Sequence, residues 1–347
     1  MGVRLAGMLA VVPSGVRGIE DLQQSMSEAE ANRIVQVTGV RERRVAAEGQ
    51  TTADLGAAAA RSLLARLGLG PDQLDGIIFV TQTPDYPLPA TACILQHELG
   101  LSKQAFAFDV NQGCAAYPYG LAIARALIVS GMAGRILLLV GDVLTKIVDP
   151  SSRASYPLFG DAATATLLKA DPDGEDVLSL TLGTDGAGWH HLVVPVGQIR
   201  YRNVGEFDRR ASDALSSICP PDRVHMNGNE IFAFTLREIP GMIERTLSAA
   251  DMSPGDVDYY FLHQANRFIL DHLCSKIGIP PEKAPQSIDR FGNTSGGSPV
   301  VTACDCLPGK ETRRELAAMF VGFGVGLSWG AALVRLRPES VWPIEEI

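Results

Sequence analysis

The stretch Pro-Asp-Gln-Leu-Asp-Gly-Ile-Ile-Phe-Val, residues 71–80, joins an acidic turn to a continuous apolar run. Such a run predicts a buried β-strand over 76–80. An Ala- and Leu-rich segment that predicts a helix, 52–67, precedes it, and a predicted helix that ends near Gly100 follows it. The same order returns around Pro-Gly-Asp-Val-Asp-Tyr-Tyr-Phe-Leu-His, residues 254–263. Two matched units of helix, acidic turn, strand, loop and helix predict a duplicated α/β fold.

The length and the charge set limits on the protein class. We expect two halves, residues 1–175 and 176–347, within the 347-residue chain. The net charge of −9 argues against nucleic acid as a partner. No apolar run approaches the roughly 18 residues that a membrane-spanning helix needs.

The six cysteines form no regular framework, and we find no secretory signal. We therefore expect reduced thiols and a cytoplasmic location. Cys304 and Cys306 lack nearby histidines, so no metal site is expected.

Other segments complete the expected α/β pattern. A helix is predicted over 121–130, with Pro118 in its first turn, where the missing N–H costs least. The segments 152–156 and 197–221 are polar and are expected to be loops or an insertion. Further strands are predicted over 5–12, 105–110, 135–140, 163–168, 318–320 and 331–336.

Cys114 is the candidate nucleophile. It lies in Asn-Gln-Gly-Cys-Ala-Ala, residues 111–116, after a predicted strand and at the start of a predicted helix. The partial positive charge at a helix N-terminus should lower the pKa of the thiol and favour the nucleophilic thiolate. Gly113, Ala115 and Ala116 leave space for another backbone or a pantetheine arm.

Two polar motifs can supply partners for this thiol. His263 opens His-Gln-Ala-Asn directly after a predicted strand, and Asn293 lies in Gly-Asn-Thr-Ser-Gly-Gly, residues 292–297. Sheets of this class bind ligands at the carboxyl ends of their strands. An imidazole and an amide can both donate hydrogen bonds to a developing enolate oxygen. The glycine-dense segment 322–326 either supplies a backbone N–H to an oxyanion or forms a tight turn.

Taken together, these motifs resemble the β-ketoacyl-acyl-carrier-protein synthase III family of the thiolase superfamily. The resemblance implies a five-layered αβαβα fold, a homodimer, and Cys114, His263 and Asn293 as the catalytic trio. It also implies an oxyanion hole built by Cys114, Val325 and Gly326. Besides the Cys114 motif, the segments that carry it are 38–43, 107–110, 159–161, 228–232, 263–266, 289–290, 292–295, 323–324 and 328–330.

The resemblance further implies the substrates. A Cys-bound acyl group would undergo decarboxylative condensation with a malonyl-type thioester of coenzyme A or an acyl carrier protein, and no cofactor would stay bound. Leu88 and Tyr117 match acyl-pocket positions. Arg33 and Val37 replace residues that bind the coenzyme A adenine in the family, which favours a specialised member. The residues expected to contact coenzyme A or the carrier are Arg33, Arg153, Arg237, Arg267 and Lys276.

Three other functions share part of this pattern. The order Cys, His, Asn also occurs in papain-like proteases, but the residues around Cys114 differ from theirs. An acyltransferase of the same fold would pass the acyl group to a hydroxyl or amine without forming a carbon–carbon bond. A catalytically inert partner subunit would be expected to lack one of the three residues, and all three are present.

Overall fold

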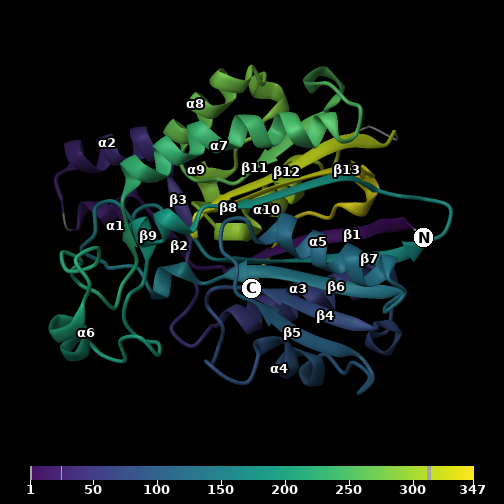
Figure 1. Ribbon diagram of the computed structural model, residues 1–347, viewed down its shortest axis with the longest axis horizontal. Helices are drawn as coiled ribbons and strands as arrows, with labels where there is room; N and C mark the ends of the chain where they lie inside the picture. Colours follow the sequence, from purple (N-terminus) through teal and green to yellow (C-terminus); the bar gives the residue numbers. More distant parts are fainter. Residues whose placement is uncertain (1, 25, 311–313) are drawn as a thin grey trace.

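Two mixed β-sheets lie on either side of a central layer of helices, and further helices cover both outer faces (Figure 1). The computed structural model describes residues 2–24, 26–310 and 314–347. In this part of the chain, no helix has the length and apolar composition needed to cross a membrane.

The first sheet has the strand order β14-β1-β7-β6-β4-β5. The pairs at the β5 end of this sheet are parallel, with Ile78 of β4 opposite Phe108 of β5 and Leu138 of β6, whereas β7 pairs antiparallel with β1 and β6. The strands are β1 (Gly2–Val12), β4 (Gly76–Val80), β5 (Phe106–Val110), β6 (Arg135–Asp142), β7 (Ala162–Asp171) and β14 (Glu345–Glu346).

The second sheet has the order β11-β12-β13-β8. β11 pairs with β12 in parallel, and Leu262 lies opposite Val321. The strands are β8 (Val177–Thr184), β11 (Tyr259–Leu262), β12 (Leu316–Gly324) and β13 (Ser328–Leu336).

Alternating residues of a strand pack against the helix layers on the two faces of the sheet. Ile77 and Phe79 of β4 pack in the outer cluster that contains α3, whereas Ile78 and Val80 pack in the central cluster. The central helices are α5 (Ala116–Val129) and α10 (Ser298–Cys306). The outer helices are α3 (Thr52–Leu67) and α4 (Thr91–Glu98) on one side, and α7 (Gly228–Ser248) and α8 (Arg267–Ile277) on the other. This arrangement confirms the predicted five-layered αβαβα fold.

Both predicted repeats are present. α3, a 3₁₀ turn (Pro71–Gln73), β4 and α4 form one unit, and α7, a 3₁₀ turn (Pro254–Asp256), β11 and α8 form the other. α3 begins at a capping box between Thr51 and Asp54 and ends at Gly68 in the left-handed conformation. The chain moves from the first sheet to the second between Asp171 and Val177, and β14 returns to the first sheet. The boundary at 175/176 stays a prediction.

The polar segment 197–221 is more ordered than the sequence predicts. It contains α6 (Val204–Arg210), whose Phe207 packs edge-on against Tyr201 at 5.2 Å between ring centroids. Both rings are buried in a small cluster of their own. The remaining α-helices and strands of the described residues are α1 (Ile19–Gln23), α2 (Glu28–Thr38), α9 (Ile288–Phe291), β2 (Val16–Gly18), β3 (Glu42–Arg44), β9 (Leu192–Val193) and β10 (His225–Met226).

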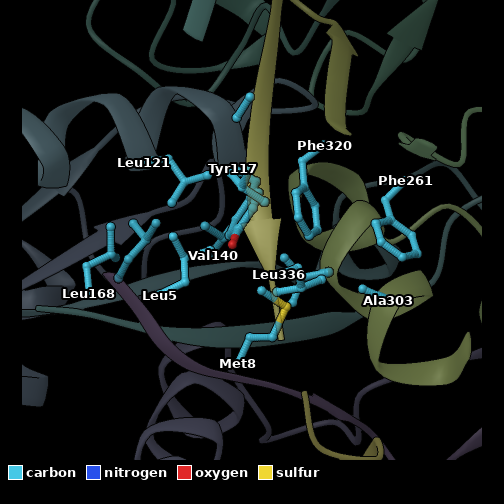
Figure 2. Close-up of a cluster of buried hydrophobic side chains, with 14 of the residues drawn as sticks. Leu5, Met8, Tyr117, Leu121, Val140, Leu168, Phe261, Ala303, Phe320 and Leu336 are labelled. Atoms are coloured by element: carbon cyan, nitrogen blue, oxygen red, sulfur yellow. The ribbon is translucent and has the colours of Figure 1, made fainter. Parts of the chain in front are cut away.

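The central layer holds the main hydrophobic core. Figure 2 shows Tyr117 of α5 beside Phe320 of β12, and their ring centroids lie 4.9 Å apart. Tyr117 is fully buried, and its hydroxyl pairs with Thr166 of β7. Truncating a ring of this size in a core typically costs about 3–5 kcal/mol of stability.

Candidate active site

Cys114 lies in the turn between β5 and α5, and its side chain is buried. It borders a cavity of about 810 Å³ that Ser295 and Val325 also line. Gly324 approaches the thiol so closely that an added Cβ would lie 2.7 Å from Sγ. A cavity of this size is typical of small-molecule and cofactor sites.

The pKa of the Cys114 thiol is raised, whereas the sequence predicted that it would be lowered. Burial raises it to about 11, and the negative charge of Asp142 adds to the effect. Hydrogen bonds from the backbone N–H groups of Val325 and Cys114 lower it. The prediction of a lowered pKa is therefore wrong, because the loss of solvent outweighs the favourable polar groups around the sulfur.

The same two N–H groups belong to residues that the sequence predicted for an oxyanion hole, and that role stays a prediction. Val325 and Cys114 each direct a backbone N–H toward the sulfur, so both donors lie beside the atom that would carry an acyl group. Gly326 lies in the following turn, where an added Cβ would meet Ser328, and its predicted role in the oxyanion hole stays a prediction. The glycine-dense segment is only partly a loop, because β12 extends to Gly324.

His263 follows β11 directly and is 2% exposed. Its Nδ1 lies 3.0 Å from the carbonyl oxygen of Ser295 and 2.9 Å from the hydroxyl of Ser298. Because a carbonyl oxygen only accepts, we assign the ring proton to Nδ1, which leaves a lone pair on Nε2. The Phe323 ring packs edge-on at 5.5 Å. Burial lowers the pKa of His263 to about 4, and the Ser295 contact opposes this shift.

Asn293 is held at both its backbone and its side chain. Its N–H donates to Leu158 at 2.9 Å, and its carbonyl accepts from Gly160 at 3.1 Å. Its Oδ1 accepts from the N–H of Ser295 at 3.0 Å, and Nδ2 donates to the carbonyl of Ala265 at 3.4 Å. The second N–H of Nδ2 has no partner among the described residues, so it can donate to a substrate oxygen.

The two predicted acyl-pocket residues occupy different environments. Leu88 is 82% exposed, and its neighbours Tyr86, Pro87 and Pro89 line the cavity. Tyr117 belongs to the central core and does not border the cavity, so its predicted role is wrong. A Tyr beside the nucleophile can point either toward the substrate or into the core, and the sequence does not distinguish the two.

The predicted basic residues form two groups. Arg153 pairs with Glu30 of α2, the helix that carries Arg33, and Arg267 of α8 packs against Gly39 at the end of α2. Farther along α7 and α8, Arg237 pairs with Glu238 at 2.7 Å, and Lys276 donates to Leu236 at 2.8 Å. The side chains of Arg153 and Arg237 are more than half exposed.

Sequence reasoning missed several residues of the site. Ser295 and Ser298 hold His263, and both follow Asn293 within a few residues. Gly324 leaves room for the thiol. Asp142 lies buried at the end of β6. A charged residue that ends an otherwise apolar strand was the feature that could have revealed it.

Known proteins resemble the whole chain. Residues 108–186 match the family model "3-Oxoacyl-[acyl-carrier-protein (ACP)] synthase III", and residues 247–336 match the model of its C-terminal region. Beta-ketoacyl-[acyl-carrier-protein] synthase III of Symbiobacterium thermophilum is 36% identical and that of Rhizobium rhizogenes 38%. The alignments cover 96% and 95% of this chain and 98% of each relative.

A solved structure shows the same agreement. The crystal structure of a 3-oxoacyl-(acyl-carrier protein) synthase from Burkholderia xenovorans LB400 matches with a TM-score of 0.93 at 36% identity. The match covers 100% of this chain and 97% of that one. Together with the near-complete alignments, it shows that the chain belongs to the β-ketoacyl-acyl-carrier-protein synthase III family.

Proposed function

We propose that this enzyme transfers an acyl group from a thioester to Cys114 and condenses it with a malonyl-type thioester. The observation that carries the proposal is the placement of Asn293. Its amide is fixed by Ser295 and Ala265 and retains a free N–H, which suits an enolate oxygen. A simple acyl transfer has no enolate to stabilise.

Acylation begins with proton transfer. The thiol of Cys114 passes its proton to Nε2 of His263, and the thiolate attacks the thioester carbonyl. The N–H groups of Val325 and Cys114 stabilise the oxyanion of the tetrahedral intermediate. The bond to the leaving sulfur then breaks, and the leaving thiolate takes a proton from solvent while His263 keeps its own.

Condensation uses the retained proton. The malonyl carboxylate leaves as CO₂, and its bonding electrons form an enolate whose oxygen accepts hydrogen bonds from Asn293 Nδ2 and His263 Nε2. The enolate carbon attacks the acyl carbonyl, the bond to Cys114 breaks, and His263 returns its proton to the departing thiolate. The product is a 3-oxoacyl thioester, and no permanently bound cofactor takes part.

The competing reaction is acyl transfer to a hydroxyl or amine. To separate the two, the enzyme is incubated with acyl-coenzyme A and a malonyl thioester, and CO₂ release and the adduct on Cys114 are measured. We expect Asn293→Ala to accept an acyl group on Cys114 but to lose about 10²–10³ in decarboxylation rate. If the wild-type enzyme consumes no malonyl thioester yet acylates a small nucleophile, the acyltransferase function replaces this proposal.

We also propose that the enzyme is a homodimer that receives carrier-bound substrates. β5 lies at the edge of the first sheet and presents Phe106 and Phe108, whose rings stack at 5.9 Å. An apolar edge strand favours pairing with a second strand. The names of the two curated relatives include the acyl carrier protein. Light scattering tests the dimer, and a single-chain mass would refute it.

A further inference from the structure

A buried carboxylate lies behind the catalytic residues. Asp142 ends β6, is 2% exposed and forms no salt bridge with the described residues. One of its oxygens accepts hydrogen bonds from the Thr81 hydroxyl at 3.0 Å, the Gln82 N–H at 2.7 Å and the Thr83 hydroxyl at 3.1 Å. The Ser295 hydroxyl also hydrogen-bonds to this carboxylate. Burial raises the pKa of the Asp142 carboxyl, and the hydrogen bonds from Ser295, Gln82, Thr81 and Thr83 oppose this shift because they favour the charged form.

Ser295 connects Asp142 to two of the candidate catalytic residues through its three polar groups. Its hydroxyl meets Asp142, its N–H donates to Asn293 Oδ1, and its carbonyl accepts from His263 Nδ1. Ser295 adopts a φ of +53°, which is uncommon for a residue with a side chain. Strained backbone of this kind persists only where its surroundings hold it. The bond to Asp142 is one such constraint.

We propose that Asp142 and Ser295 form a positioning unit: the carboxylate anchors the Ser295 hydroxyl, the Ser295 backbone fixes His263 and Asn293, and the carboxylate charge offsets the proton that His263 holds between acylation and condensation. This inference rests on the proposed function. In the proposed mechanism, the titratable groups that act on the imidazole are Cys114, which exchanges a proton with it, and Asp142, which lies behind Ser295. Ser298 and Phe323, which also contact the ring, carry no charge.

The rates of decarboxylation and of acylation together distinguish a loss of positioning from a general loss of folded structure. Ser295→Ala removes the anchor and leaves both oxyanion donors in the chain. Because a misplacement of about 1 Å can cost about 10²-fold in rate, we expect decarboxylation by the acyl-enzyme to fall by about this factor. Acylation of Cys114, which does not use the Asn293 amide, should fall less. The matched control is Ser287→Ala, because Ser287 is also buried, but its hydroxyl bonds to Thr302.

Asp142→Asn tests the charge, because the amide can keep the hydrogen bonds. Decarboxylation needs the proton on His263, so its rate should decline as the pH rises. Without the negative charge, this decline should move to lower pH by about one unit. In the free enzyme, iodoacetamide should alkylate Cys114 faster at a fixed pH, because the charge that disfavours the thiolate is gone. A packing defect predicts neither change.

The outcomes are distinct. The proposal is overturned if Ser295→Ala and Ser287→Ala behave alike, or if Asp142→Asn changes neither the pH profile nor the alkylation rate. If Asp142→Asn does not fold, the comparison of the two serine variants decides. If the wild-type enzyme releases no CO₂, the proposed function fails, and the alkylation arm still tests the charge of Asp142 separately.

Discussion

Gly324→Ala should disable the nucleophile without altering any catalytic side chain. An added Cβ at this position would lie 2.7 Å from Cys114 Sγ and 2.8 Å from Cys114 Cβ. Ordinary contacts between heavy atoms of this kind are about 3.5–4.0 Å, so the thiol would have to move by about 1 Å. Such a displacement can cost about 10²-fold in rate, which corresponds to about 2.7 kcal/mol. The φ of +154° at Gly324 adds strain of about 1–3 kcal/mol.

Two measurements test this reasoning. Acylation of Cys114 is followed by intact-protein mass, and the free energy of unfolding is obtained from urea titration. Gly228→Ala is the control, because Gly228 starts α7 and an added Cβ would meet no atom within 4 Å. We expect normal acylation in the control and equal or higher stability. A Gly324→Ala enzyme that is acylated at the wild-type rate would refute the close packing of this glycine against the thiol.

Four further predictions follow from the site and its surroundings. His263 is neutral in the folded protein with a pKa of about 4, against 6.5 when unfolded, so stability should fall by about 3 kcal/mol as the pH drops from 7 to 4. Urea titrations of wild type and His263→Gln at several pH values check this. The same dependence of unfolding free energy on pH in the two proteins would contradict it. Because the pKa of Cys114 is about 11, its alkylation rate should keep rising up to about pH 10, and a plateau below pH 9 would be inconsistent with burial. Leu88→Trp should shorten the preferred acyl chain in an acyl-coenzyme A panel, and an unchanged preference would show that Leu88 lies outside the acyl pocket. Arg267→Glu should lower kcat/KM for a carrier-bound thioester, with a smaller effect in 1 M salt, where the Debye length is about 3 Å; an effect independent of salt would argue against electrostatic docking.

The sequence was sufficient where information is local. β4 and α3 have the predicted bounds, because their apolar patterns and flanking caps lie within a few residues. The short motifs around Cys114, His263 and Asn293 identified the catalytic candidates for the same reason. The five layers were expected from the family resemblance, and the packing of alternating residues of β4 explains them.

The rest depends on contacts between distant parts of the chain. Thr81, Asp142 and Ser295 meet only in the folded protein, so no spacing in the sequence relates them. Tyr117 lies three residues after the nucleophile, yet the facing strand β12 draws it into the core. The pKa of Cys114 likewise depends on how much solvent the surrounding layers exclude. Burial is a property of the whole fold, whereas the helix N-terminus can be seen in the sequence.

These distant contacts bear on the order of the reaction. In the free enzyme, burial favours a neutral thiol, with a pKa of about 11, and a neutral imidazole, with a pKa of about 4. Proton transfer from Cys114 to His263 is therefore unfavourable until a thioester gives the thiolate a carbonyl to attack and the oxyanion hole a charge to bind. In the proposed mechanism, acylation of Cys114 removes its negative charge, and the proton that His263 retains is offset by the carboxylate of Asp142 behind Ser295. Acylation thereby produces the hydrogen-bond donor that decarboxylation requires, which favours acylation before the malonyl step.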